Sequence, residues 1–110
     1  MTTIASKKYP GTRREGPYIH VTVCDNIFEA RLETGSDITV IPRKVVKDLV
    51  IGETLRIRQA TDIVKVFTYI VTLKILDREF TLPVLLSDVD TSIIGLDILQ
   101  YFRVEFLYNT

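Results

Sequence analysis

The feature that most constrains the fold of this chain is an alternation of apolar and polar residues. From Ile19 to Val23 every second residue is a branched apolar one, and a similar alternation returns over residues 27–32. A period of two residues is typical of half-buried strands, because successive strand side chains point to opposite faces. Asp25-Asn26 separates the two segments, and both residues tolerate the positive φ of a tight turn. The sequence therefore predicts a β-hairpin.

Runs of β-branched and aromatic residues predict most of the remaining structure as strands. The most extended run, residues 63–75, is separated from residues 55–58 by the polar segment Gln59 to Asp62, which predicts a long hairpin with a polar tip. Further strands are expected at residues 38–41, 80–86 and 103–108, and short helices at residues 42–49 and 96–102. Short strands with two small helices predict an all-β chain, folded as a mostly antiparallel barrel or sandwich.

Length and charge disfavour several classes of function. At 110 residues the chain has room for one domain, and its 46% hydrophobic and 25% charged residues are typical of a globular protein. Fourteen basic and fourteen acidic side chains cancel, which disfavours a β-barrel that binds nucleic acid and gives no attraction to an anionic membrane. The sequence shows neither a membrane-spanning apolar stretch nor the apolar core of a signal peptide. We therefore expect no membrane partner, no specific nucleic acid and no signal-directed secretion.

Residues 1–16 differ in composition from the rest and are expected to form a flexible basic arm. A leader or linker is the favoured interpretation of such a segment, and an arm that contacts a partner or nucleic acid is the alternative. Residues 17–110 are then the folded domain. The basic residues of the arm, opposed only by Glu15, are Lys7, Lys8, Arg13 and Arg14.

His20 and Cys24 are the only residues of their types, and they do not support catalysis or metal binding. On one strand they would lie about 13 Å apart, at about 3.3 Å per residue, which exceeds the hydrogen-bond reach of a thiolate–imidazole pair. One histidine and one cysteine cannot build a zinc site, and no glycine-rich phosphate-binding loop occurs. We therefore expect no metal and no cofactor. The lone thiol is compatible with a reducing compartment.

One group of residues has the pattern of a catalytic site. Glu33-Thr34-Gly35 is the only acid–hydroxyl–glycine tripeptide in the chain, and it lies where a predicted strand ends. Ser36-Asp37 and a β-branched strand follow directly. Sixty positions later, counting from Gly35 to Gly95, Ile93-Ile94-Gly95 precedes a predicted short helix. The pattern places a carboxylate on a tight loop between two strands, with a hairpin of a size to fold over a cleft.

In order and spacing these motifs resemble the retropepsin family, the proteases of retroviruses and LTR retrotransposons, over nearly all of residues 18–108. The family pattern is an apolar strand, Asp-Thr/Ser-Gly-Ala/Ser, a β-branched strand, a flap hairpin, an apolar-apolar-Gly motif, a helix and a terminal strand. The resemblance implies a retropepsin-like closed β-barrel with a flap hairpin and one or two short helices, active as a two-fold homodimer. The corresponding segments are Phe28 to Leu32, Glu33 to Asp37, Ile38 to Ile41, Ile93 to Gly95 and Leu96 to Leu99.

The resemblance also implies an activity, the endopeptidase cleavage of polyproteins. This class uses two carboxylates about 3 Å apart that share one proton, and a chain with one such carboxylate needs a second copy on a two-fold axis. The catalytic residues would be Glu33, Thr34 and Gly35, with Thr34 clasping the two loops and Gly35 allowing close approach of the substrate. The implied substrate is an extended peptide or polyprotein, and the implied location is the cell interior, a virion or a virus-like particle.

Further site residues follow from the same resemblance. Asp37 and the flap tip would contact the substrate backbone, which binds as an added strand; a loop-capping role is the alternative for Asp37. The terminal strand, Arg103 to Tyr108, would pair in the dimer interface. The flap-tip residues are Gln59, Ala60, Thr61 and Asp62, and those that would support the catalytic loop are Ser36, Ile93, Ile94 and Gly95.

The sequence departs from the family pattern at its central position, where Glu33 replaces aspartate. The additional methylene carries the carboxylate about 1 to 1.5 Å further out, and misplacing a catalytic group by about 1 Å costs about 100-fold in rate. The glutamate is either an introduced change or the natural residue of a slow or inactive protein, so a non-catalytic dimerisation or peptide-binding module is the alternative function. Two lesser departures are a flap tip without glycine and Leu96 where many members carry arginine.

Overall fold

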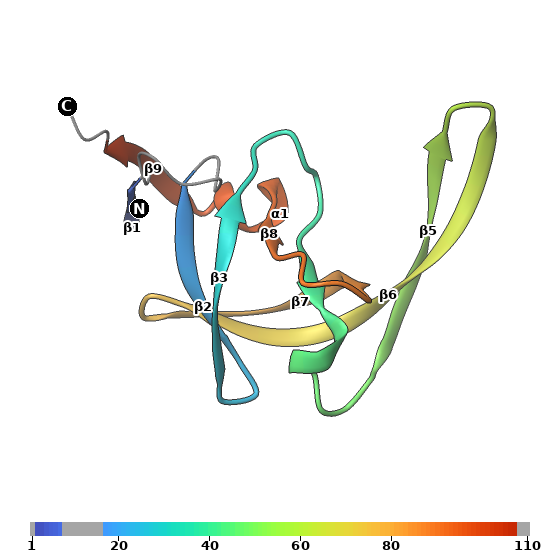
Figure 1. Cartoon of the computed structure of the whole chain (residues 1–110), viewed down its shortest axis with the longest axis horizontal. Coiled ribbons are helices and arrows are strands. Elements are labelled where there is room, and N and C mark those ends of the chain that lie inside the picture. Colours follow the sequence, from blue (N-terminus) through green and yellow to red (C-terminus); the bar gives the residue numbers. More distant parts are fainter. Residues whose placement is uncertain (1, 8–16, 108–110) are drawn as a thin grey trace.

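The computed structural model describes residues 2–7 and 17–107, which form a β structure with two short helices (Figure 1). The predicted all-β class is confirmed. Within these residues no helix is long and apolar enough to cross a membrane. The elements in chain order are β1 (Thr2–Lys7), β2 (Tyr18–Val23), β3 (Asn26–Leu32), β4 (Val40–Pro42), the 3-10 helix η1 (Arg43–Val45), β5 (Ile51–Gln59), β6 (Asp62–Ile75), β7 (Arg78–Ser87), β8 (Ile93–Ile94), α1 (Leu96–Leu99) and β9 (Phe102–Leu107).

Strand β6 closes the barrel by pairing along both of its edges. It pairs with β7 on one edge and, near its end, with β2 on the other, where Val21 lies opposite Ile75. The ring of strands runs β6–β7–β4–β8–β3–β2 and returns to β6. The β3–β8 and β4–β7 contacts are parallel, and the other contacts of the ring are antiparallel. The expected closed barrel is confirmed.

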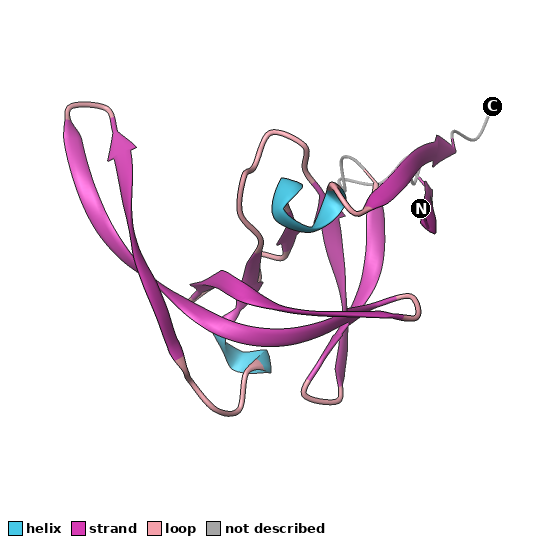
Figure 2. Ribbon diagram, turned by 180° about the vertical axis from the view of Figure 1, so that it is seen from behind, coloured by secondary structure: helices cyan, strands magenta, loops and turns pink. Residues whose placement is uncertain are grey.

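The first half of β6 leaves the barrel and pairs with β5, so that the two strands project as a long hairpin (Figures 1 and 2). The last pair of this hairpin is Gln59–Asp62, and Ala60 has a φ of 47° in the turn. The predicted hairpin with a polar tip is confirmed, although β5 begins at Ile51 instead of residue 55.

A β-bulge marks the base of this hairpin. The pairing register shifts between Ile51 and Thr54, which leaves an additional residue on β5. The buried Thr68 hydroxyl of β6 donates a hydrogen bond to the carbonyl oxygen of Glu53 across the bulge. A Cβ on Gly52 would lie 2.7 Å from that hydroxyl. The bulge therefore has room for glycine and for no larger residue while Thr68 keeps its position.

Branched aliphatic side chains fill the barrel interior, and the predicted alternation describes their placement. In β2, Val21 and Val23 are buried and Ile19 is half-buried, while in β3 the buried residues are Ala30 and Leu32. Together the buried hydrophobic residues are Val21, Val23, Ala30, Leu32, Ile41, Val45, Val71, Leu73, Ile75, Val84, Ile94, Ile98, Leu99 and Phe102.

The turn between β2 and β3 lies one residue earlier than predicted. Val23 pairs with Asn26, so Cys24 and Asp25 are the turn residues, with φ values of 48° and 68°. Positive φ at both central positions belongs to the tight hairpin turn whose twist matches that of the strands. Core burial decides the register, because a slip by one residue would move every side chain of the strand to the opposite face.

Both helices are shorter than predicted. The helix expected at residues 42–49 is a single 3-10 turn, and it ends because Val46 is extended with φ −101° and ψ 125°. The helix expected at residues 96–102 is the single turn α1, since the buried Phe102 already belongs to β9. In each case packing against the barrel sets the length, and local helix propensity does not.

The N-terminal residues depart from the expected arm over part of its length. Residues 2–7 form β1, which pairs in parallel with β9 from Thr2–Phe102 to Lys7–Leu107 and meets β2 at Tyr18. An edge strand presents unpaired backbone groups to any segment, whatever its side chains, so the sequence pattern held no signal for β1. The remaining arm residues, Lys8, Arg13 and Arg14 among them, lie outside the described residues.

We predict that Ile75→Ala lowers the free energy of unfolding by about 2–5 kcal/mol, because a fully buried side chain is lost where β6 closes on β2. Urea denaturation followed by circular dichroism measures this loss. Leu76→Ala is the matched control: Leu76 is 52% exposed, so its truncation should change stability by less than about 0.5 kcal/mol. Equal losses in the two variants would contradict the closure of the barrel at Ile75.

Candidate active site

Parallel pairing of β3 with β8 brings the two sequence motifs together. Leu32 lies opposite Ile94, and the amide of Glu33 donates to the carbonyl oxygen of Ile94 at 3.0 Å. The loop then tightens, since the amide of Ser36 donates to the carbonyl oxygen of Glu33 at 3.2 Å. Glu33 is thus held by its backbone at the point where β3 leaves the sheet, beside Gly95.

Gly95 is packed against the loop backbone. Leu96 donates its amide hydrogen to the carbonyl oxygen of Ser36 at 2.8 Å. A Cβ on Gly95 would lie 2.7 Å from that same oxygen and 2.8 Å from the carbonyl oxygen of Ile38. Because backbone atoms on both sides would have to move, this position requires glycine. The expected place of Gly95 beside the loop is observed.

A hydrogen-bond network that the sequence did not predict holds the far side of the loop in place. Thr39 is fully buried, and its amide and hydroxyl donate to the two carboxylate oxygens of Asp97 at 2.9 and 2.7 Å. The same hydroxyl accepts the amide hydrogen of Gly95 at 3.2 Å. The Thr39 hydroxyl therefore both donates and accepts a hydrogen bond, and it joins residues 58 positions apart in the sequence. No sequence pattern connects them.

The carboxylate of Glu33 faces a cation two residues earlier, on β3. Its Oε2 lies 3.3 Å from Nη2 of Arg31, and the side chains are 39% and 40% exposed. Residues two apart share a strand face, which is the sequence signal that could have revealed this pair. A built Cβ on Gly35 would lie 3.4 Å from the other carboxylate oxygen, so the carboxylate extends over Gly35. Thr34 and Gly35 are exposed.

Asp37 lines an open cavity of about 420 Å³ between the loop and the base of the hairpin. The cavity lining combines apolar residues of β5 and β7 with acidic residues, which suits an extended chain with apolar side chains. The hairpin tip, residues 59–62, lies at the far end of β5 and β6, and Figures 1 and 2 show it separated from the Glu33 loop. The residues that line the cavity are Asp37, Ile38, Glu53, Leu55, Thr68, Leu82, Pro83 and Asp97.

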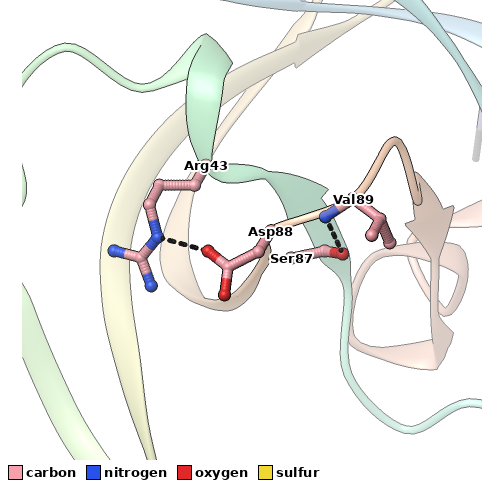
Figure 3. A network of polar contacts seen from close by, with 4 residues as sticks. All are labelled: Arg43, Ser87, Asp88 and Val89. Carbon is pink, nitrogen blue, oxygen red and sulfur yellow. Dashed lines mark hydrogen bonds and ion pairs between the residues drawn. The ribbon is translucent and has the colours of Figure 1, made fainter.

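The segment that leads into β8 is anchored by polar contacts (Figure 3). Nε of Arg43 donates to Oδ1 of Asp88 at 3.1 Å, and the amide of Val89 donates to the hydroxyl of Ser87 at 3.1 Å. The Asp88 carboxylate raises the pKa of the Arg43 guanidinium, and Tyr69 adds to the effect. Within residues 2–7 and 17–107, no three metal-ligating side chains gather.

No protein-family model matches the chain, and no curated protein matches it in sequence. Among solved structures, EIAV protease complexed with the inhibitor HBY-793 matches with a TM-score of 0.63 and 26% sequence identity, over 86% of this chain and 92% of that one. The fold is retropepsin-like.

We predict that Thr39→Val destabilises the protein more than Thr39→Ser. Valine preserves the volume but leaves the amide of Gly95 and the Oδ1 oxygen of Asp97 without their buried partner, at a cost of about 1–3 kcal/mol. Serine keeps the hydroxyl and loses one methyl, at about 1 kcal/mol. Chemical denaturation of both variants tests this. A valine variant as stable as the serine variant would show that the network contributes nothing.

Proposed function

We propose that the chain is an aspartic endopeptidase domain of retroviral or retrotransposon type, which cleaves polyprotein peptide bonds inside a cell, virion or virus-like particle. One observation carries the proposal: in a retropepsin-like fold, a carboxylate follows β3 on a loop held by hydrogen bonds to Ile94 and Ser36. The cavity beside Asp37 and the projecting hairpin supply a place for an extended peptide.

Hydrolysis by this site needs two chains, because each contributes one Glu33. Two carboxylates that meet on a two-fold axis share a proton, since both cannot ionise at about 3 Å. The ionised one accepts a proton from a bound water, whose oxygen attacks the carbonyl carbon of the substrate. The protonated one donates its proton to the carbonyl oxygen. The tetrahedral intermediate then collapses and the C–N bond breaks. The leaving nitrogen takes up the proton that the first carboxylate accepted from the water, and a hydroxyl of the intermediate returns a proton to the second carboxylate.

The remaining site residues act by position in this proposal. Thr34 clasps the loop of the partner chain, and Gly35 lets the substrate backbone approach. Asp37 binds the substrate backbone from the barrel side. The flap tip, Gln59 to Asp62, covers the peptide from the opposite side, and closing over it requires the tip to move toward the loop.

Two features of Glu33 reduce the expected rate. The longer side chain carries its carboxylate beyond the place of an aspartate carboxylate, which crowds the pair on the axis. The ion pair with Arg31 at 3.3 Å also competes with pairing of the two carboxylates on the axis. This contact is the observation that favours the second candidate, a catalytically inactive module that dimerises or binds peptides.

We predict that Glu33→Asp raises the rate of peptide cleavage by about 100-fold, because the shorter carboxylate returns to the dyad position and no longer reaches Arg31. The measurement is cleavage of a mixed peptide library at about pH 5, where a carboxylate pair holds one proton. Glu33→Gln is the control, since it keeps the size of the side chain and removes the acid. If the aspartate variant dimerises and still does not cleave, the inactive module replaces the protease.

We also predict that activity requires association of two chains. The specific activity of Glu33→Asp should fall on dilution, because only the dimer holds both carboxylates. Initial rates over a dilution series, compared with sedimentation of the same samples, measure this dependence. Constant specific activity in samples that sediment as monomers would exclude a shared carboxylate pair.

A further inference from the structure

One face of the β5–β6 hairpin is not used by the proposed peptidase chemistry. In the pairing register Arg56 lies opposite Lys65, and Arg58 lies opposite Ile63. Side chains that lie directly opposite, or two residues along a strand, share a face. These four therefore lie on one side of the hairpin, together with Phe67, and all five are exposed. We call this surface the basic face.

The charges of the basic face are not compensated within the described chain. Across residues 2–7 and 17–107, no ion pair or hydrogen bond joins Arg56, Arg58 or Lys65 to an acid. Like charges directly opposite on paired strands are destabilising, so the Arg56–Lys65 pair is a cost to the isolated hairpin. The hairpin acids do not offset it: Glu53 lines the cavity at the opposite face, and Asp62 alternates onto that face.

The basic face borders a free backbone edge. β5 is the outermost strand of the sheet at this end, and among the residues that the structure describes its only strand partner is β6. The outward N–H and C=O groups of an edge strand can pair with an added strand. On the other side of β5, Leu55 and Ile57 are half-buried and apolar. A strand added to this edge would meet arginines on one face and aliphatic side chains on the other.

We propose that the free edge of β5 binds an extended acidic peptide in which acidic and apolar residues alternate. Backbone pairing would supply the alignment, Arg56 and Arg58 would meet the acidic side chains, and Leu55 and Ile57 would meet the apolar ones. The spacing of the charges matches on the two strands. Side chains two residues apart are separated by about 6 to 7 Å on β5 and on the added peptide, twice the rise per residue. This edge lies on the opposite side of β5 from β6. The site needs no contribution from Glu33, and it shares one apolar residue, Leu55, with the cavity beside Asp37.

Other occupants fit the surface less well. A second copy of the chain that paired through β5 would set arginines against arginines, which is unfavourable. Nucleic acid and anionic lipid offer no backbone groups to complete a strand edge, and a chain of zero formal net charge gives them no long-range attraction. An acidic peptide uses the cations, the free edge and the apolar flank together.

The probe is a fluorescein-labelled peptide of alternating glutamate and valine, about eight residues long to span β5, and the readout is fluorescence anisotropy with the full chain. The double variant Arg56→Gln/Arg58→Gln should bind it about tenfold more weakly, because two exposed charge pairs are lost. The matched control, Lys47→Gln/Lys74→Gln, removes the same charge from exposed positions elsewhere and should bind as the parent does.

A second peptide separates strand addition from simple charge attraction. N-methylation of alternate backbone nitrogens keeps the charges and prevents pairing, so this peptide should not bind, while the unmodified one should slow amide hydrogen exchange in β5. The proposal is overturned if the methylated peptide binds equally well, or if the two double variants lose affinity equally. It is also overturned if a single-stranded oligonucleotide or phosphatidylserine vesicles bind in place of the peptide, or if nothing binds; in that last case the arginines serve only to keep the edge from aggregating.

Discussion

The double pairing of β6 is the interaction on which the rest of the structure depends. Over its second half this strand binds β7 along one edge and β2 along the other, which closes the barrel around the aliphatic core. Over its first half it carries β5 out from the barrel as a hairpin. A closed barrel has no edges except at its ends, so the unpaired edge of this region is confined to β5. The same strand thus joins the core to the hairpin.

The barrel strands could be predicted because the alternation of apolar and polar residues follows which side chains are buried. Val21, Val23 and Ala30 lie inward as their sequence pattern indicates. The lengths of the helices and the pairing of β1 could not be predicted, because they depend on contacts with distant segments. Val46 leaves the helical conformation, and β1 is held by backbone pairing with β9, which needs no particular side chains.

The candidate site shows the same division. The Glu33 loop and Gly95 could be found because glycine and an acid at the end of a strand form a local motif. The bonds from Thr39 to Asp97 could not, because a hydrogen bond between residues 58 positions apart leaves no periodicity in either segment. The ion pair between Arg31 and Glu33 could be predicted in part. Their separation of two residues predicts a shared face, but it does not predict the geometry of the pair.

The bulge at Gly52 has a mechanical consequence. Thr68 bridges the strands there, and beyond it the pairing of β5 with β6 continues without a register shift from Thr54–Phe67 to Gln59–Asp62. That stretch acts as a stiff lever about 17–20 Å long, at the rise of a paired strand. With its pivot at the bulge, a rotation of about 10° sweeps the tip through an arc of about 3 Å, on the scale of hinge motions that a few residues absorb. A small angular change beside the barrel would therefore become a large displacement at the hairpin end.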